Sequence, residues 1–457
     1  MHSNQIIRYS AVFLLLLFVA TMPSRAQQTI PSLSLSQAVD SALQRNHLLK
    51  IKEYQLKEKK AGIKKAKIKH FPSVTVSSTY RYNKNTASLD IQKGEFGSLP
   101  LSPSVMIPLP NADKSFELLE HENFKAGVSL YQPISEQPKI YTGVQVSQTE
   151  ASMAGVEKHK AKQQITLSVE KLYYGILINQ KKQEQAKAKL ELAKMKLHDT
   201  ESAIQAGKMV DANKAALKAT VADKKQELLK LKIEAQDHRS DFERLTGMSL
   251  AQVKLQNVEN NTLSLNPLAS YKSEASNHNV DLQLASLKQK KSRLAIKAAR
   301  ENYIPNLGFI AGYSYQKGST IYPTYNPYVG IHFEWNLQDI FSDKQIVEQR
   351  KNVYQQAREH WLNMQEKVDN EVEKAYRKLT QIESLIETAQ KAVSYRRQAY
   401  RIQKNKQDAG LNTKADLLNA RADLTKSQAD LYAAQLQYQL ALSKLRIVTE
   451  GKDRFYQ

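Results

Sequence analysis

Residues 165–206 read ITLSVEKLYYGILINQKKQEQAKAKLELAKMKLHDTESAIQA and belong to a run, 144–206, that contains no proline. Apolar or small residues recur in alternating steps of four and three, at Ile165, Val169, Leu172, Ile176, Ala186, Leu190, Ala193, Leu197 and Ile204. Asn179, Gln183 and Thr200 occupy the intervening positions of this seam. A spacing of 3.5 residues sustained over such a length is typical of long helices that pack side by side. As one helix the run would be roughly 95 Å long.

A second run, 210–245, keeps the same spacing after a short break. Its seam residues are Leu217, Val221, Lys224, Leu228, Leu231, Ala235, His238, Phe242 and Leu245. Gly207 lies between the two runs and can adopt the left-handed backbone that reverses a helical chain. The two runs therefore predict a very long antiparallel coiled-coil hairpin.

The chain contains this hairpin twice, with an offset of 203 residues. Glu170-Lys-Leu-Tyr173 corresponds to Glu373-Lys-Ala-Tyr376, and Gly207 corresponds to Gly410. The second seam comprises Val368, Val372, Ala375, Leu379, Ile382, Ile386, Ala389, Val393, Ala420, Leu424, Leu431, Ala434, Tyr438, Ala441, Leu445 and Val448. The register holds across both legs and the turn without a gap, which indicates an internal duplication.

A shorter helical segment precedes each hairpin. We expect one helix over about 36–70, starting at the capping-box spacing of Ser34 and Gln37, and its counterpart over about 268–302. The two match at an offset of 233, which pairs Asn46 with Asn279 and Pro72 with Pro305. Each is about half as long as the long helix, so the short helix and the return leg could stack end to end beside it.

Two strands follow each short helix and its proline. Apolar and polar residues alternate along 73–82 and 307–315, and partner strands are expected at Phe124–Tyr131 and Tyr328–Trp335. Strands of about ten residues with terminal aromatics suit both a membrane β-strand and a soluble two-faced sheet. Four strands cannot form a barrel without edges, so a membrane sheet would need several chains. Residues expected mainly on a lipid face are Val74, Val76, Leu307, Phe309, Val329, Ile331 and Phe333.

The first strand pair has the longer loop. Its extra residues, within 85–121, include the proline-rich stretch 99–110, which suits an extended polyproline conformation. A surface loop is the simplest interpretation, and a lid or receptor role is the alternative. Residues 247–267 are expected to form a linker that could pack as a belt around the middle of the rod.

The N-terminus and the composition limit the possible functions. Residues 1–26 have a basic start, a short apolar core and a Ser-Arg-Ala cleavage site, which predict a signal peptide. The net charge is +22, but the lysine-rich run 57–69 lacks base-stacking aromatics and is interpreted as a solvated helix face. The chain has no cysteine and no enzyme motif that we could identify, so we expect no catalytic, cofactor or metal site and no nucleic-acid partner. His238, on the seam, is interpreted as a packed residue.

The sequence resembles the outer membrane efflux protein (TolC) family over nearly all of the chain after residue 26. The resemblance rests on the opening Leu33-Ser-Leu-Ser-Gln-Ala-Val-Asp-Ser-Ala-Leu-Gln-Arg-Asn46, on Thr413-Lys-Ala-Asp-Leu-Leu-Asn-Ala-Arg421, and on the repeated order of helix, strand pair and long hairpin. It implies a mainly α fold with a membrane β part, in which a homotrimer shares a twelve-stranded barrel and an α-helical periplasmic barrel. It also implies partners: outer membrane lipid, a periplasmic adaptor and an inner-membrane pump.

The resemblance places the functional positions at the two hairpin turns. Gly207, Lys208, Gly410 and Leu411 are candidate adaptor contacts, and Asp416, Asn213, Asn412 and Asn419 are candidates for a pore constriction. The family commonly has an acidic residue six positions after the turn glycine, which Asp416 matches and Asn213 does not. The positions of a charge lock known in the family hold Gln407, Asn412 and Asn419 here, so we expect no such lock. Alternatively, Asp416 only stabilises a helix N-terminus.

The leading hypothesis is an outer membrane channel that serves as a passive export duct for small molecules. A protein-secretion channel with an ATP-driven transporter is one alternative, and a structural or adaptor coiled-coil protein of the envelope is another. The expected organisation is a signal peptide (1–26), a first repeat (27–246), a linker (247–267), a second repeat (268–449) and a tail (450–457).

Overall fold

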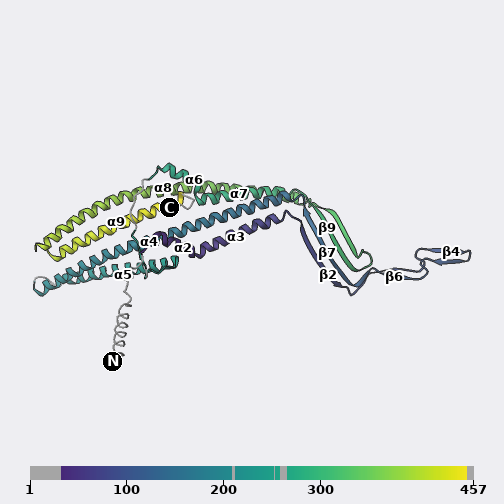
Figure 1. Cartoon of the computed structure of the whole chain (residues 1–457), viewed down its shortest axis with the longest axis horizontal. Coiled ribbons are helices and arrows are strands. Elements are labelled where there is room, and N and C mark those ends of the chain that lie inside the picture. Colours follow the sequence, from purple (N-terminus) through teal and green to yellow (C-terminus); the bar gives the residue numbers. More distant parts are fainter. Residues whose placement is uncertain (1–31, 208–211, 252, 258–264, 450–457) are drawn as a thin grey trace, which may run out of the picture.

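The computed structural model describes residues 32–207, 212–251, 253–257 and 265–449. The predicted signal peptide, the predicted tail and Lys208 lie outside the described residues, and so does the side chain of Asn213. The described part is a long rod, with helices along most of its length and strands at one end (Figure 1). The predicted mainly α fold with a β part is confirmed.

Both predicted hairpins are present. The first consists of α4 (Gln137–Gln205) and α5 (Ala212–Thr246), and the second of α8 (Asp339–Asp408) and α9 (Lys414–Thr449). The seam residues are buried or half-buried, and several, such as Val169, Val372 and Leu379, are fully buried. Tyr174 and Leu436, which lie off the seam, are buried as well. In the half of the rod that ends at the two hairpin turns, the helices lie in the order α5, α4, α9, α8, because α4 also packs against α9.

The two short helical segments are each broken into two helices, so the expectation of one unbroken helix over 36–70 and another over 268–302 is wrong. The first segment comprises α2 (Leu35–Arg45) and α3 (His47–Ile68), and the second comprises α6 (Leu268–His278) and α7 (Val280–Glu301). Asn46 leaves the helical conformation, and its side chain accepts hydrogen bonds from the backbone N–H groups of Leu48 and Leu49. Asn279 caps α7 in the same way. An asparagine that can start a new helix competes well with helix continuation.

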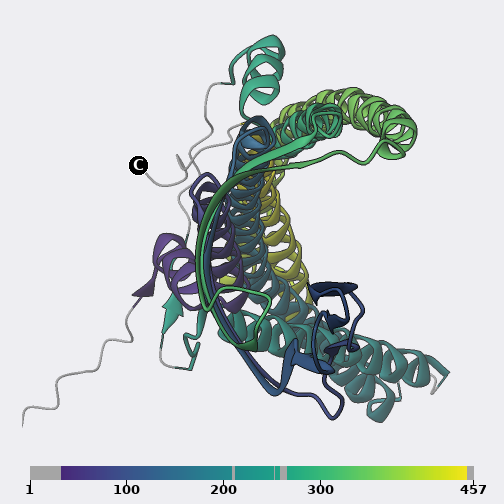
Figure 2. The same cartoon turned by 90° about the vertical axis from the view of Figure 1, so that its right-hand side faces the viewer.

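The short and the returning helices share the length of the long ones, as the sequence predicted. Next to the sheet, α3 and α7 pack against α4, and α7 also packs against α8, which gives the order α3, α4, α7, α8. Among the helices of the described residues, only α4 and α8 run through both halves of the rod. Seen along the rod, the helices form a curved wall (Figure 2).

The main core of the rod gathers around Tyr173 on α4. The ring is fully buried among α2 and α5 residues such as Val39 and Phe242. Its hydroxyl donates to the carbonyl oxygens of Leu33 (2.9 Å) and Gln256 (2.7 Å). These carbonyls flank a short parallel pair, β1 (Ser32–Leu33) with β8 (Lys254–Leu255). The described part of the 247–267 linker is therefore fastened to the middle of the rod.

The sheet has four antiparallel strands, β2 (Ser73–Tyr82), β7 (Leu119–Pro133), β9 (Asn306–Ser319) and β10 (Tyr325–Glu334). Their order is β10-β9-β7-β2, so β10 and β2 are the free edges. The two repeats share one register: Ser78 pairs with Ala126, and their equivalents Ala311 and Val329 pair as well. The duplication is therefore exact in the paired strands as well as in the helices.

The long first loop forms further strands. These are β3 (Ser88–Ile91), β4 (Ser98–Ser102), β5 (Val105–Pro108) and β6 (Lys114–Glu117). The polyproline expectation for 99–110 is wrong, because Leu99 pairs with Ile107 and Pro100 with Met106 in an antiparallel hairpin. Proline is tolerated in such edge strands, where it does not have to donate a hydrogen bond. This hairpin projects beyond the end of the sheet (Figure 1).

Candidate functional site

The four-stranded sheet has one apolar and one polar face. Because side chains alternate along a strand and opposite residues share a face, the register assigns each residue to one side. The apolar face carries Val74, Val76, Tyr80, Val128, Leu130, Leu307, Phe309, Ala311, Tyr313, Val329, Ile331 and Phe333. The opposite face carries mainly polar residues and glycines, such as Ser73, Thr75, Ser77, Thr79, Lys125, Ser129, Gly312, Ser314, His332 and Glu334. All seven residues named from the sequence as lipid-facing candidates lie on the apolar face.

The apolar face is uncovered in the single chain. Val76, Val329 and Ile331 are each more than 70% exposed. Aromatic rings gather where the strands meet the loops: Tyr325 lies against Tyr313 and Tyr315, and Phe124 lies against Tyr315. An exposed apolar surface of this extent, bordered by aromatics, indicates a surface that contacts other protein or lipid.

The helical wall is likewise incomplete at its edges. Helix α3 exposes Ile51, Tyr54 and Ile68 on the side away from α4, and α5 exposes Leu229 and Ile233. At the other edge, α8 exposes the large apolar side chains of Phe341, Leu385, Tyr395 and Ile402. Apart from α2 and α6, which pack against the long hairpins in the middle of the rod, the described wall is one helix thick. The edge helices therefore lack a neighbouring helix on their outer side, just as β2 and β10 lack a neighbouring strand.

Both candidate turns have the geometry that the sequence predicted for their glycines. Gly207 has φ +72° and Gly410 has φ +71°, the left-handed conformation that glycine adopts without strain. Leu411 follows Gly410 and is 76% exposed, which suits a contact residue. Its backbone N–H donates to the carbonyl oxygen of Lys406 (2.8 Å), closing the end of α8.

Two of the constriction candidates have structural partners inside the second turn. The side-chain amide of Asn412 donates to the carbonyl oxygen and the side-chain oxygen of Gln403, at 2.9 and 2.8 Å. Asp416 forms a capping box with Thr413: its carboxylate accepts from the Thr413 backbone N–H (3.1 Å) and hydroxyl (2.6 Å), and its own N–H donates to that hydroxyl. These hydrogen bonds lower the pKa of Asp416, with a smaller contribution from Lys196. The helix-capping role of Asp416 is therefore present, and the carboxylate is still exposed.

The structure brings the candidates together only in part. Asn412 and Asp416 share the second turn, and Asn419 is exposed one turn further along α9. The first turn lies at the same end of the rod but on the other hairpin (Figure 1). An ion pair between Glu191 of α4 and Arg421 of α9 (3.7 Å) connects the two hairpins near this end.

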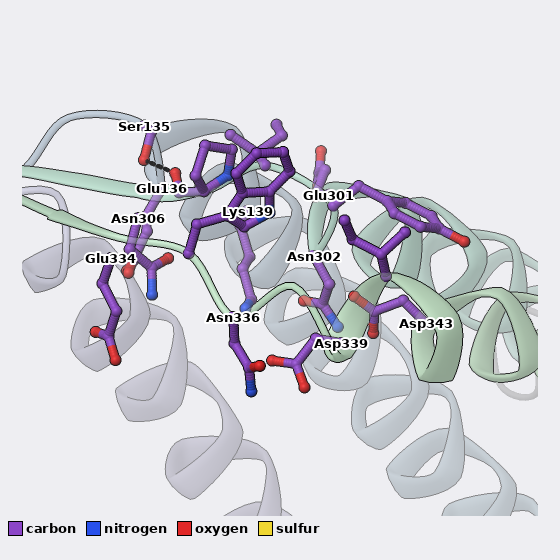
Figure 3. Close-up of a pocket in the computed structure, with 15 residues that line it drawn as sticks. Ser135, Glu136, Lys139, Glu301, Asn302, Asn306, Glu334, Asn336, Asp339 and Asp343 are labelled. Carbon is purple, nitrogen blue, oxygen red and sulfur yellow. Dashed lines mark hydrogen bonds between the residues drawn. The ribbon is translucent and has the colours of Figure 1, made fainter.

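An acidic cavity of about 300 Å³ at the junction of sheet and helices was missed by the sequence reasoning. Five carboxylates and one lysine line it, namely Glu136, Glu301, Glu334, Asp339, Asp343 and Lys139. Figure 3 shows Glu334, Asn336 and Asp339 pointing to the same side of it. The lining comes from 135–139, 301–306 and 334–343, segments that only the fold brings together. The one available signal was that Glu136 and Asp339 are equivalent under the 203-residue offset.

The described residues contain neither a cluster of metal-ligating side chains nor an apolar helix of membrane-spanning length. Their histidine, aspartate and glutamate side chains do not gather in a group of three or more that could hold a metal ion. Among the same residues, we find no helix that is long and apolar enough to cross a membrane. His238 lies against Gly175, where an added Cβ atom would approach its ring to 3.4 Å, which agrees with a packed seam residue.

Comparison with known proteins gives consistent matches. The sequence model for outer membrane efflux proteins matches residues 38–248 and 272–449. Three solved structures share the fold. The CmeC outer membrane channel of Campylobacter jejuni has a TM-score of 0.73 and 16% sequence identity, and the match covers 93% of this chain and 87% of that one. For the outer membrane protein VceC of Vibrio cholerae the TM-score is 0.69 and the identity 16%, with 92% of this chain and 97% of that one covered. For the MtrE outer membrane channel of Neisseria gonorrhoeae in its open state the TM-score is 0.68 and the identity 13%, with 93% of this chain and 90% of that one covered. A search of curated protein sequences gave no match.

Proposed function

Since the chain belongs to the outer membrane efflux protein family, we propose that it is the outer membrane channel of a tripartite efflux system. In this proposal three copies form a passive duct that exports small molecules across the periplasm and the outer membrane. The observation that carries the proposal is the one-layer wall with free edges, which runs through the helices and the sheet alike. Such a wall encloses a lumen only when several copies join edge to edge.

The strand edges determine how the copies would join. β10 of one copy would pair with β2 of the next, and α8 would pack against α3 and α5 of the next copy. Two copies would give eight strands, and the interior of an eight-stranded barrel is just wide enough for its own side chains. Three copies give twelve strands and room for a duct, and the resemblance to trimeric channels supports this number.

The two faces of the sheet then have separate roles. The apolar face would meet lipid, and the polar face would line the water-filled lumen. This is the arrangement of outer membrane barrels, whose strands of about ten residues alternate between lipid and lumen. The loop hairpins β3 to β6 would lie outside the cell, since long loops of such barrels are extracellular.

The helical part would cross the periplasm. Helix α4 has 69 residues and would be roughly 100 Å long. The far end of the rod carries the turns at Gly207 and Gly410, which we propose as contacts for a periplasmic adaptor that joins the duct to an inner-membrane pump. Asp416 would form a ring of carboxylates near these turns, since symmetry repeats it in every copy, and such a ring favours cations.

Export is tested by complementation. The gene would be expressed together with adaptor and pump genes from the same genome in a host that lacks its own outer membrane efflux channel. We expect lower accumulation of a fluorescent efflux substrate than in cells without the channel. A properly inserted trimer that leaves accumulation unchanged, while restoring secretion of a protein substrate, would favour the protein-secretion alternative.

A further inference from the structure

We infer that Lys69 of one copy enters the acidic group at the start of α8 in the adjacent copy and forms an ion pair with Asp339. The acidic group comprises Asp339, Asp343 and Glu301, which line the cavity at the junction of sheet and helices. The inference rests on the proposed function, because it requires copies joined edge to edge. It identifies the residues that hold two copies together at the level where sheet and helices meet.

The acidic group lies in a cavity whose lining carries more acids than cations: five carboxylates and one lysine, Lys139. Asp343 is 5% exposed, and in the part of the chain that the structure describes it has no side-chain hydrogen bond or ion pair. The Glu301 side chain is 10% exposed; one of its oxygens accepts from Thr142 (2.9 Å), and Lys297 is 3.9 Å away. Its other oxygen, Oε2, is buried without a hydrogen-bond partner. Buried carboxylate oxygens are costly unless a donor reaches them, so this group is prepared for a further cation.

Helix α3 supplies unpaired cations on the opposite edge of the chain. Lys52 and Lys59 pair with α4 residues, at 2.8 Å to Glu157 and 3.6 Å to Glu150. Lysines near the end of the helix are exposed and form no ion pair among the described residues; they are Lys64, Lys65, Lys67 and Lys69. Lys69 is the last of these, at the C-cap just before the sheet. The acidic group lies at the same level of the rod, where α8 begins.

The duplication supplies a template for the contact between copies. Within one chain, the start of α4 lies beside the segment 301–306: the Ser135 hydroxyl donates to the carbonyl oxygen of Pro305 (2.6 Å) and accepts from the Leu307 N–H (2.7 Å). The equivalent of the α4 start is the start of α8, and the equivalent of 301–306 is 68–73. Because the sheet registers of the two repeats agree under these offsets, the start of α8 should lie in the same way beside 68–73 of the adjacent copy.

The template places two opposite charges together. Glu136 and Asn302 line the same cavity within the chain. Their equivalents are Asp339 on α8 and Lys69 on the adjacent copy. Within the chain an acid and an amide line one cavity; between copies the equivalent positions hold an acid and a lysine. Attraction between Asp339 and Lys69 would favour packing of the α8 edge against the α3 edge of a second copy over packing of two α8 edges or two α3 edges.

Disulfide cross-linking tests whether residues 69 and 339 of adjacent copies lie close together. The sequence has no cysteine, so no native thiol competes with the introduced pair. Lys69→Cys and Asp339→Cys would be combined in one chain, assembled in lipid or detergent and exposed to a mild oxidant. We expect covalent dimers and trimers on a non-reducing gel, and monomers from each single variant. The matched control combines Lys67→Cys with Asp339→Cys, because Lys67 is exposed on a different side of the same helix end. Equal cross-linking of both pairs would overturn the inference.

A second pair separates this inference from the proposed function. Ser129 of β7 pairs with Gly312 of β9 within the chain. Their equivalents in the other repeat, at offsets of 203 and 233, are His332 of β10 and Thr79 of β2. We therefore expect His332 to lie opposite Thr79 of the next copy. If His332→Cys with Thr79→Cys cross-links while Lys69→Cys with Asp339→Cys does not, the duct stands and the ion pair is refuted. If neither pair cross-links and the protein is monomeric, both fail.

Charge exchange tests the chemistry of the contact. Lys69→Glu should lower the fraction of trimer by roughly tenfold, because like charges opposed across an interface are strongly unfavourable. Adding Asp339→Lys to this variant should restore most of the trimer. A trimer fraction that is insensitive to Lys69→Glu, or a double variant that is no better than the single one, would overturn the ion pair.

Discussion

Substitution of Val76 by arginine tests which face of the sheet meets lipid. Val76 lies near the middle of β2 and is 76% exposed in the single chain, so it contributes little to the chain's own packing. On a water-exposed surface such a change alters the free energy of unfolding by about 0.5 kcal/mol or less. Near the middle of a bilayer it costs roughly 2–4 kcal/mol, equivalent to about a 30- to 700-fold change in the folding equilibrium.

Ser77→Arg is the matched control, because Ser77 is the next residue along β2 and is exposed on the opposite face. Both variants would be reconstituted in lipid vesicles and unfolded with urea, with tryptophan fluorescence as the signal. We expect a large loss of stability for Val76→Arg and a change of about 0.5 kcal/mol or less for Ser77→Arg. Equal losses, or a larger loss for Ser77→Arg, would refute the assignment of the two faces.

Three further predictions concern the turns and the core. Asp416→Asn should weaken the cation preference of single channels in planar bilayers without a large rise in conductance; unchanged selectivity would remove Asp416 from the pore, and a several-fold rise would reveal a charge lock. Gly410→Ala should lower the free energy of unfolding by roughly 1–2 kcal/mol, because the space around Gly410 is open but its positive φ is unfavourable for alanine. The control Gly62→Ala, within α3, should be neutral or stabilising, and equal effects of the two changes in denaturation experiments would contradict this. Tyr173→Phe should lower the free energy of unfolding by about 1–3 kcal/mol, because it removes the hydroxyl whose proton is shared between the carbonyl oxygens of Leu33 and Gln256. It should also speed hydrogen exchange of the Gln256 N–H, which donates to Leu33; unchanged exchange would show that the hydroxyl does not hold β8.

Much of the fold could be predicted from the sequence because it rests on repeating contacts. The 3.5-residue spacing follows directly from helix geometry, so the seams around Val169 and Leu379 are visible without a structure. The breaks at Asn46 and Asn279 were not predicted, because an asparagine within a helical pattern can either continue the helix or cap a new one. Their equivalent positions in the two repeats were the available signal.

The candidate site was less accessible to sequence reasoning. The alternation in 73–82 shows that β2 has two faces, but only the register with β7 shows that Val76 and Val128 share one. The proline-rich loop did not reveal its strand pairing, because the pairing of Leu99 with Ile107 depends on a turn whose geometry the composition does not fix. The acidic group around Asp343 depends on three distant segments and could not be found by spacing. Asp416 was named from the sequence as a constriction residue, which stays a prediction, and the structure adds that it caps α9.

The number of copies in the assembled protein tests the central claim most directly. The full-length protein would be extracted from the outer membrane fraction in detergent, and its mass would be measured by native mass spectrometry. One chain of the full sequence has a mass of 51.9 kDa before any processing. We predict a species of three copies in that fraction. A monomer, or a protein found only in the soluble periplasmic fraction, would contradict the account.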